Sequence, residues 1–465
     1  MRICSILLLL AATLGACAHP RPRLQSSVAV PATQIQASSF GHMPGESSPP
    51  PSAFVNRMAE SATDMPSNCA QPRFAAAAGQ RSPSADHLVL SGGSLNGAFG
   101  AGFFLGLEEA GGLPAEPRVV TGVSTGALQA TFLFLARQPV PQDRDYAWQG
   151  GIATEEGGGL PALKPNQSNI GDLALAYSIR READILRPAP GGGIGMLING
   201  AKGSLAPLRH RLMALISPGT IEAVAFQACR GRKLLVGVTD VDDGYGYALD
   251  LTLLALRAYD GNATDNLMTL VRKAYVESLI ASSSVPVGAK PVTLRIRDFD
   301  RPLLEQHRIN LFVDGGARFG VFLQELQEAQ SETMRRTARP GAVTMVVNTR
   351  LAIRPWHSGD LTAPKKGWLL TTLGLRTVSI LENQVYHLSV ATIEGQAPNL
   401  RMAFISNQNI PGGVEPDDHV YRGTSCTGWH DRDEAEFDPV QFFPRYMACL
   451  IDYGRNRGRR QEWNR

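Results

Sequence analysis

The sequence predicts an α/β domain in which parallel strands are joined by crossover helices. The first sign is a short apolar run at 87–90 that leads directly into a glycine-containing loop. A helical pattern over 98–110, an apolar strand over 118–123 and a second helical pattern over 127–136 follow with short connections. Strand, helix, strand, helix in this order is the connectivity of a parallel sheet.

Similar elements continue along the chain. We expect further strands at 234–241, 310–313, 342–348 and 402–405, and helices at 267–281 and 321–338. The stretch 150–203 is different because it carries two glycine triplets and no clear periodicity, so we interpret it as a long insertion. Such an insertion is either a mobile cover over a site or a decoration.

Composition sets limits on the class of protein. The chain has 465 residues, with 43% hydrophobic and 19% charged residues, which is typical of a globular protein with a substantial core. The net charge of +3 gives no reason to expect nucleic acid as a partner. A basic tail at 456–465 is either a solvated terminus or a weak contact with anionic lipid headgroups.

The N-terminal residues are typical of a targeting segment. Residues 1–16 combine Arg2 with an apolar run that is too short to span a bilayer. The ending Leu14-Gly15-Ala16-Cys17 resembles the bacterial lipoprotein signal, which implies a lipid on Cys17 and a place in the cell envelope. Ala18, where an inner-membrane retention signal has Asp, favours the outer membrane. The alternative is a plain secretory signal.

Residues 17–84 are rich in Pro, Ser, Ala and Gln, and we interpret them as a flexible tether to the anchor. Removal of the signal and lipidation of Cys17 leave four cysteines in an oxidising compartment, Cys69, Cys229, Cys426 and Cys449. Cys426 and Cys449 are near in sequence and could pair, although four cysteines allow three connectivities. No spacing resembles a zinc site, so we expect no metal and no cofactor.

The first candidate for chemistry is Ser124, the centre of Gly122-Val123-Ser124-Thr125-Gly126. Gly-x-Ser-x-Gly places a serine on a tight turn between a strand and a helix, with Gly122 and Gly126 leaving room for nearby backbone. The pentapeptide alone is a weak signal, but here a strand precedes it and a helical pattern follows. The alternative is a structural turn with an idle serine.

The second candidate is the loop at Gly92, Gly93 and Ser94, which precedes a helix. Successive backbone N–H groups beside a helix N-terminus form an anion-binding concavity, as an oxyanion hole requires. A phosphate-binding loop is the competing interpretation, but the loop lacks the Gly-Lys-Ser/Thr ending. The spacing of Gly92, Gly93 and Gly97 also differs from the dinucleotide fingerprint.

The third candidate is Asp314, which ends a short strand and precedes Gly315-Gly316. Ligand sites of parallel sheets lie beyond the carboxyl ends of the strands, so a carboxylate at this place is positioned like a catalytic group. The alternative is an aspartate that caps the turn by accepting from nearby N–H groups.

The order of glycine loop, Gly-x-Ser-x-Gly and Asp-Gly-Gly resembles the patatin-like phospholipase family, over about residues 86–454. The segments 277–291, 437–439 and 450–454 also resemble this family. The resemblance implies a hydrolase domain over 85–455, folded as a three-layer sandwich with a mostly parallel central sheet between helices. It also implies hydrolysis of phospholipid or other lipid esters by a Ser124–Asp314 dyad without histidine, with the oxyanion held by Gly92, Gly93 and Ser94.

The glycine loop departs from the family pattern at two positions. Ser94 replaces a third glycine, and Asn96 stands where Arg or Lys is common. These changes leave open a lipid-anchored binding protein without activity on the same fold. A Ser-His-Asp hydrolase is a further alternative, and it needs a late histidine. The available ones are His357, His387, His419 and His430. The sequence leaves the oligomeric state open.

Overall fold

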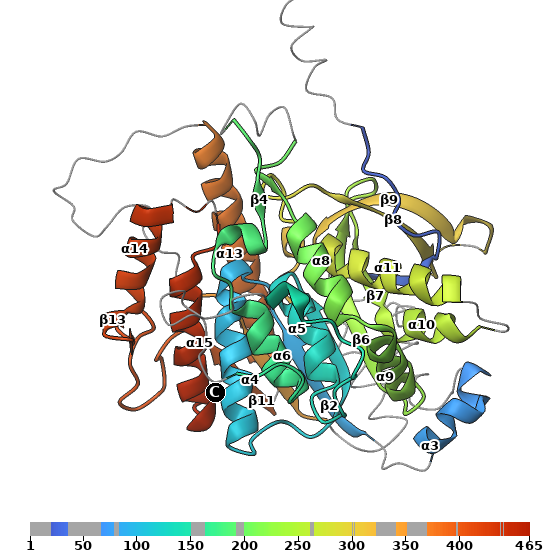
Figure 1. Cartoon of the computed structure of the whole chain (residues 1–465), viewed down its shortest axis with the longest axis horizontal. Helices are drawn as coiled ribbons and strands as arrows, with labels where there is room; N and C mark the ends of the chain where they lie inside the picture. The colour runs from blue at the N-terminus through green and yellow to red at the C-terminus, as the bar shows by residue number, and fades with distance from the viewer. Residues whose placement is uncertain are drawn as a thin grey trace, which may run out of the picture.

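The computed structural model describes residues 20–35, 67–78, 83–149, 163–191, 200–260, 265–299, 301, 303–321, 341–350, 370–396, 399–437, 439 and 441–465. Its centre is a nine-stranded sheet in the order β11-β10-β2-β3-β6-β7-β1-β8-β9 (Figure 1). The strands are β1 (Val30–Ile35), β2 (Ser84–Leu90), β3 (Pro117–Val123), β6 (Lys233–Asp240), β7 (Gly246–Asp250), β8 (Val292–Asp298), β9 (His307–Asp314), β10 (Val343–Val347) and β11 (Leu400–Phe404).

The sheet is mixed, so the expected α/β fold with helices around a central sheet is confirmed, whereas the expected predominance of parallel strands is not. β11, β10, β2 and β3 are parallel to their neighbours, and β6 is parallel to β3, as the crossover pattern predicts. Beyond β6 the chain turns back through short hairpins, and a short connection between strands forces antiparallel pairing. β9 also pairs with β6, which closes β6, β7, β1, β8 and β9 into a ring of strands.

The tether expected at 17–84 differs from the structure where residues are described. β1 lies inside the sheet, antiparallel to β7 and parallel to β8, and most of its side chains are buried. Pro31 hides this strand from sequence analysis because proline is rare in central strands. Further along, Cys69 is joined to Cys229 by a disulfide bond. The folded domain therefore begins well before residue 85, while residues 1–16 and Cys17 lie outside the described residues.

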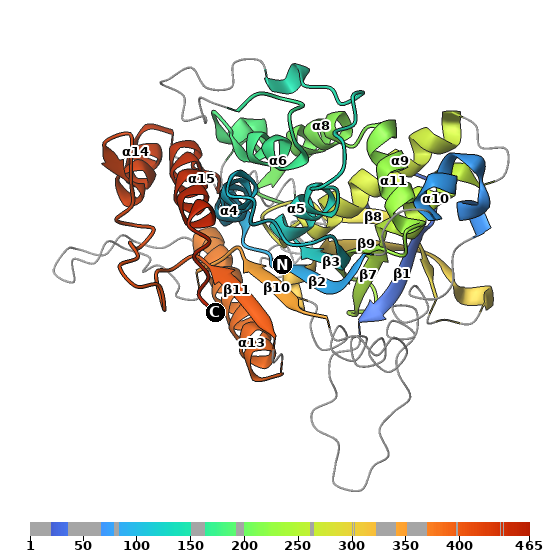
Figure 2. The ribbon, with the colours of Figure 1, turned by 90° about the horizontal axis from the view of Figure 1, so that it is seen from below.

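Helices cover both faces of the sheet (Figure 2). On one face lie α4 (Gly97–Glu109), α5 (Thr125–Phe134), α6 (Asn169–Tyr177), α8 (Ala206–Leu215), α9 (Pro218–Ala228), α10 (Leu251–Leu256), α11 (Asp265–Ser282) and α15 (Pro444–Arg459), with α14 (Cys426–Phe437) outside α15. On the other face lies α13 (Leu370–Gln396). Each face has its own apolar cluster, and Val390 of α13 belongs to the smaller one. No helix among the described residues is long and apolar enough to cross a membrane.

The C-terminal residues are also part of the domain, so the expected basic tail at 456–465 is wrong. α15 packs on α4 with glycines at the contact, where a Cβ at Gly102 would lie 2.0 Å from the Ile451 carbonyl oxygen. Arg457 is buried and donates to the carbonyl oxygens of Phe404 and Ser406. The arginines therefore serve packing and capping, and the suggested pair Cys426–Cys449 is a disulfide bond that joins α14 to α15.

Candidate active site

Ser124 occupies the sharp turn between β3 and α5. Its backbone angles are φ 53° and ψ −123°, a strained conformation for a residue with a side chain. The flanking glycines make the turn possible, because a Cβ at Gly122 would lie 2.4 Å from the Gly126 carbonyl oxygen. A Cβ at Gly126 would lie 2.5 Å from the carbonyl oxygen of Leu90 at the end of β2. The turn therefore sits against the strand that leads into the glycine loop.

Ser282 holds this turn from behind. The Ser124 N–H donates to the Ser282 hydroxyl at 2.9 Å, and that hydroxyl donates to the Gly237 carbonyl oxygen at 2.6 Å. Ser282 is the last residue of α11 and is fully buried. Sequence analysis missed its role, because a serine at a helix end gives no signal of a partner more than 150 residues away.

Strand register brings Asp314 to Ser124. β3 ends at Val123, which pairs with Gly237 of β6. Beyond this point β6 pairs with β9, which runs antiparallel to it. The last residue of β9, Asp314, pairs with Val238. The two strand ends therefore meet at adjacent positions of β6. The close approach needs Gly315, where a Cβ would lie 2.7 Å from the Gly237 carbonyl oxygen.

The two carboxylate oxygens of Asp314 have different surroundings. Oδ1 accepts from the Gly316 N–H at 2.7 Å, so the turn-capping interpretation is correct for this oxygen. Oδ2 is buried and has no hydrogen-bond partner among the described residues. Burial raises the pKa of Asp314 to about 7, and the nearby Ser124 hydroxyl and the Gly316 N–H partly oppose this rise. Oδ2 is therefore free to take a proton from Ser124.

The glycine loop presents donors without acceptors. Among the described residues, none accepts a hydrogen bond from the N–H groups of Gly92, Gly93 or Ser94. Gly93 has φ +147°, and a Cβ there would lie 1.5 Å from the Asn348 carbonyl oxygen, so glycine is required. Ser94 adopts φ 53° despite its side chain, and its hydroxyl accepts from the Gln441 amide at 2.6 Å. The loop thus leaves these three N–H groups available to a ligand, with serine at its third position.

A buried polar network fixes this loop to the domain. The Asn348 N–H donates to the Ser91 hydroxyl at 2.8 Å, and the Asn348 amide donates to the Ser91 carbonyl oxygen at 2.9 Å. Asn348 and Gln129 exchange hydrogen bonds, and Gln129 donates to the Gly97 carbonyl oxygen at 2.8 Å. All three side chains are fully buried. Because every link is satisfied, the network makes the loop rigid. The sequence pattern did not identify Asn348 or Gln129.

Ser124 also lines a deep apolar cavity. Its empty volume is about 750 Å³ when the space open to solvent at its mouth is included. Its polar lining includes Ser94, Ser283 and Gln441 beside Ser124. The remaining walls are mainly aliphatic and aromatic, formed by Leu128, Phe132, Leu173, Ile185, Leu205, Leu208, Leu212, Val285 and Met447.

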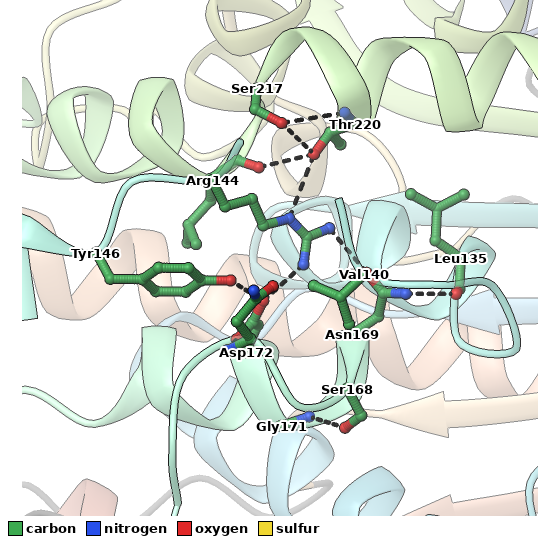
Figure 3. Close-up of polar contacts among 12 residues, drawn as sticks. Leu135, Val140, Arg144, Tyr146, Ser168, Asn169, Gly171, Asp172, Ser217 and Thr220 are labelled. Atoms are coloured by element: carbon green, nitrogen blue, oxygen red, sulfur yellow. Dashed lines mark hydrogen bonds and ion pairs between the residues drawn. The ribbon is translucent and has the colours of Figure 1, made fainter. Parts of the chain in front are cut away.

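One wall of the cavity belongs to α6, within the stretch interpreted as an insertion. The described part of that stretch is packed, not decorative, since a buried ion pair anchors it (Figure 3). Arg144 donates to Asp172 of α6 at 2.7 Å and to Asn169 at 2.8 Å, and Tyr146 donates to Asp172 at 2.5 Å. Residues 150–162 and 192–199 of this stretch lie outside the described residues.

The histidines offered for a Ser-His-Asp triad are not brought to Ser124 where they are described. His419 pairs with Asp452 at 2.8 Å and lines a separate polar cavity beside α15. His430 stacks on Phe443, with ring centroids 4.2 Å apart. His387 is exposed on α13, and His357 lies outside the described residues. The structure therefore favours a carboxylate as the partner of Ser124.

The one cluster of metal-ligand type among the described residues lies on α14 and combines His430, Asp431 and Glu434. Its carboxylates are exposed, and none of the three lines the Ser124 cavity. Exposed acidic groups are common without an ion, so the expectation of chemistry without a metal remains a prediction.

Comparison with known proteins agrees with this geometry. The family model of patatin-like phospholipase matches residues 88–326, a span that includes Ser124 and Asp314. This chain belongs to the patatin-like phospholipase family. Members of the family are in general lipid acyl hydrolases.

The comparisons with curated proteins and with solved structures add little to the family match. A search of curated proteins found no match. Among solved structures, the chain is similar to VipD from Legionella pneumophila, with 12% sequence identity and a TM-score of 0.24. The match covers 80% of this chain and 66% of VipD, and it carries no argument about the site.

Proposed function

We propose that this family member hydrolyses carboxylic esters of membrane lipids, with Ser124 as nucleophile and Asp314 as general base. One observation carries the proposal. Ser124 lies where an apolar cavity, a carboxylate oxygen and three N–H groups meet, and neither that oxygen nor those N–H groups have a hydrogen-bond partner among the described residues. Acyl transfer requires a site for the acyl chain, a base and an oxyanion hole. The cavity, the carboxylate oxygen and the N–H groups match these requirements in turn.

The acylation step follows from this arrangement. The Ser124 hydroxyl oxygen attacks the ester carbonyl carbon while its proton moves to Oδ2 of Asp314. The carbonyl oxygen becomes an oxyanion, which the N–H groups of Gly92, Gly93 and Ser94 stabilise. When the tetrahedral intermediate collapses, the bond to the leaving oxygen breaks. Asp314 then gives its proton to that oxygen, which leaves as an alcohol.

Deacylation uses the same groups in the same roles. Asp314, again ionised, takes a proton from a water that attacks the acyl carbon. The second intermediate collapses to a carboxylic acid and regenerates the Ser124 hydroxyl. A carboxyl with a pKa near 7 suits both steps, because it can accept and return a proton at neutral pH.

The predicted lipid anchor supports a membrane substrate. The described chain starts at Pro20, and Arg21 donates to Asp242 at 2.5 Å, so the chain is held on the domain from a position close in sequence to Cys17. A lipid on Cys17 would therefore keep the site within a short distance of the outer membrane and raise the local concentration of substrate. Labelling with a palmitate analogue tests this part, since loss of the label in Cys17→Ser is expected.

The decisive experiment for activity is digestion of a defined lipid mixture followed by mass spectrometry. We expect the wild type to release fatty acids and Ser124→Ala to release none above background. A fluorophosphonate probe with an acyl chain should label the wild type at Ser124. Ser94→Gly serves as the matched control, because it restores the family residue while keeping the backbone N–H.

Two results would contradict the proposal in different ways. Folded wild-type protein that neither digests lipids nor reacts with the probe would indicate a binding protein. If instead one of the His→Ala variants at 357, 387, 419 or 430 abolished the chemical step, a histidine would replace Asp314 as the base.

A further inference from the structure

The helix α13 comes from a part of the chain that the family match does not include. The match ends at residue 326, and α13 spans Leu370–Gln396. It lies on the face of the sheet opposite α4 and α5 (Figure 2). Two hydrogen bonds hold it close to the site. Asn383 donates to the Arg350 carbonyl oxygen at 3.0 Å, and the Gly320 N–H donates to Ser389 at 3.3 Å.

Tyr386 extends from α13 to the centre of the site. A Cβ built on Gly92 would lie 1.8 Å from the Tyr386 hydroxyl oxygen and 3.0 Å from the Ser124 Cβ. A Cβ built on Gly316 would lie 3.1 Å from the same hydroxyl. The phenol oxygen is therefore in contact with the oxyanion loop, close to the nucleophile and to the turn after Asp314. The ring is held as well, because it packs against Gly320, where a Cβ would lie 2.4 Å from it.

The surroundings keep Tyr386 protonated. Burial raises its pKa well above 10, and the carboxylates of Asp314 and Glu382 raise it further. Glu382 lies one turn earlier on the same helix face. Burial, with the charge of Asp314 added, raises the pKa of Glu382 to about 8. At neutral pH the hydroxyl of Tyr386 is thus a neutral donor inside a buried site.

We propose that Tyr386 is a third catalytic group, whose hydroxyl donates a hydrogen bond to the ester oxygen that becomes the oxyanion at Ser124. The inference rests on the proposed function. The cavity beside Ser124 and Tyr386 approach Ser124 from different directions, since neither Tyr386 nor any other α13 residue whose side chain is described lines that cavity. The ester is then held between the cavity and the phenol. Tyr386 keeps its proton throughout, so it adds no step to the transfer from Ser124 to Asp314.

This role also gives a physical reason for Gly92. Any side chain at position 92 would occupy the place of the Tyr386 hydroxyl, so the glycine and the tyrosine fit each other. The proposed role of Tyr386 also bears on the glycine loop, which departs from the family pattern at Ser94. A side-chain donor from α13 supplements the N–H groups of a loop whose third residue, Ser94, is in a strained conformation.

The test removes one oxygen atom. Tyr386→Phe keeps the ring against Gly320, and we expect kcat to fall about 100-fold with KM unchanged, as for loss of one oxyanion donor. Tyr275→Phe is the matched control. It removes a buried phenol oxygen that bonds Thr131 at 2.8 Å, between α11 and α5, and should leave kcat unchanged.

A second measurement separates the oxyanion from ground-state binding. A trifluoromethyl ketone with a lipid chain forms a tetrahedral oxyanion adduct at a serine, whereas an ether lipid of the same chain cannot. We expect Tyr386→Phe to weaken the ketone about 100-fold and to leave the ether unchanged. Equal weakening of both inhibitors, or a rise in KM with kcat unchanged, would show that Tyr386 only shapes the binding site.

The outcomes distinguish this inference from the proposed function. If the wild type is active and Tyr386→Phe matches it in kcat and in ketone binding, the inference is wrong and the dyad stands. If the folded wild type shows neither activity nor a ketone adduct, the proposed function fails and the inference fails with it.

Discussion

Two buried aspartates show how the same side chain serves different ends in this protein. Asp172 lies on α6, and Asp314 ends β9; both are almost completely shielded from solvent. Both oxygens of Asp172 have partners, since Oδ2 accepts from Arg144 and Tyr146 and Oδ1 accepts from the Asn166 N–H at 2.9 Å. Only one oxygen of Asp314 has a partner, and no cation is bonded to it in the described part of the chain.

The difference indicates what each carboxylate contributes. A buried charge with a partner on each of its oxygens fixes one arrangement of its neighbours, and here it fixes the α6 wall of the cavity beside Ser124. A buried carboxylate with an open oxygen has a raised pKa and can exchange a proton near neutral pH. Asp314 lacks the arginine and tyrosine partners that Asp172 has, which is what the proposed role as a base requires.

The largest expected effect comes from Asp314→Asn. Without the base, kcat should fall about 10³- to 10⁴-fold, which steady-state kinetics on a lipid ester would show. The free energy of unfolding, in contrast, should not fall in Asp314→Asn at neutral or higher pH. The pKa of Asp314 in the folded state, about 7, is above its unfolded value, so ionisation destabilises the fold as pH rises from about 4 through 7.

Thermal denaturation at two pH values tests this sign. Asp314→Asn should be at least as stable as the wild type at pH 8, and its advantage should vanish near pH 4. In the wild type, kcat/KM should fall below about pH 7 as Asp314 takes up its proton, with Glu382 and Tyr386 as its titratable neighbours. An unchanged acid limb in the residual activity of Asp314→Asn would assign the limb to another group.

The second expected effect is on stability and comes from Asp172→Asn. It leaves the Arg144 guanidinium buried without a countercharge, so the free energy of unfolding should fall by about 3–5 kcal/mol. Glu109→Gln is the control, because Glu109 pairs with Arg455 and Arg459 at a partly exposed site, where less than about 1 kcal/mol is expected. Similar urea midpoints for the two variants would mean that the Arg144–Asp172 pair does not anchor α6.

The sequence predicted the parallel half of the fold because its signals are local. A buried strand, a glycine turn and an apolar helix recur between residues 87 and 136, and each is visible within a few residues. β6, β9, β10 and β11 lie within two or three residues of the expected strands. The expected helix at 321–338 lies almost wholly outside the described residues.

What the sequence could not predict depends on long-range pairing. The sequence of β1 is typical of a proline-rich linker. It forms a strand only because it pairs with β7 and β8, which are more than 200 residues away. The site divides in the same way. Ser124, Asp314 and the glycine loop belong to motifs, whereas Ser282, Asn348 and Tyr386 reach the site from distant elements through hydrogen bonds and packing.

The smallest effect is expected from Ser282→Ala. This variant tests whether the activity of the proposed dyad depends on the hydrogen bonds that hold the Ser124 turn. Ser282→Ala removes the hydroxyl that joins the Ser124 N–H to the Gly237 carbonyl oxygen and leaves both buried groups without a partner. A loss of about 1–3 kcal/mol in stability is expected. Because the same bond holds the strained turn of Ser124, kcat should also fall, by about 10-fold.

Ser278→Ala is the matched control for Ser282→Ala. Ser278 lies one turn earlier on α11, is equally buried, and donates only to the Ala274 carbonyl oxygen of its own helix at 2.8 Å. Its replacement should leave kcat and the rate of labelling by a fluorophosphonate unchanged. If both variants lost the same activity, the packing of the end of α11, and not the Ser282 hydrogen bond, would be what affects the site. A loss confined to Ser282→Ala would show that one hydrogen bond from α11 keeps the nucleophile in its strained turn, as Arg144 keeps α6 against the cavity.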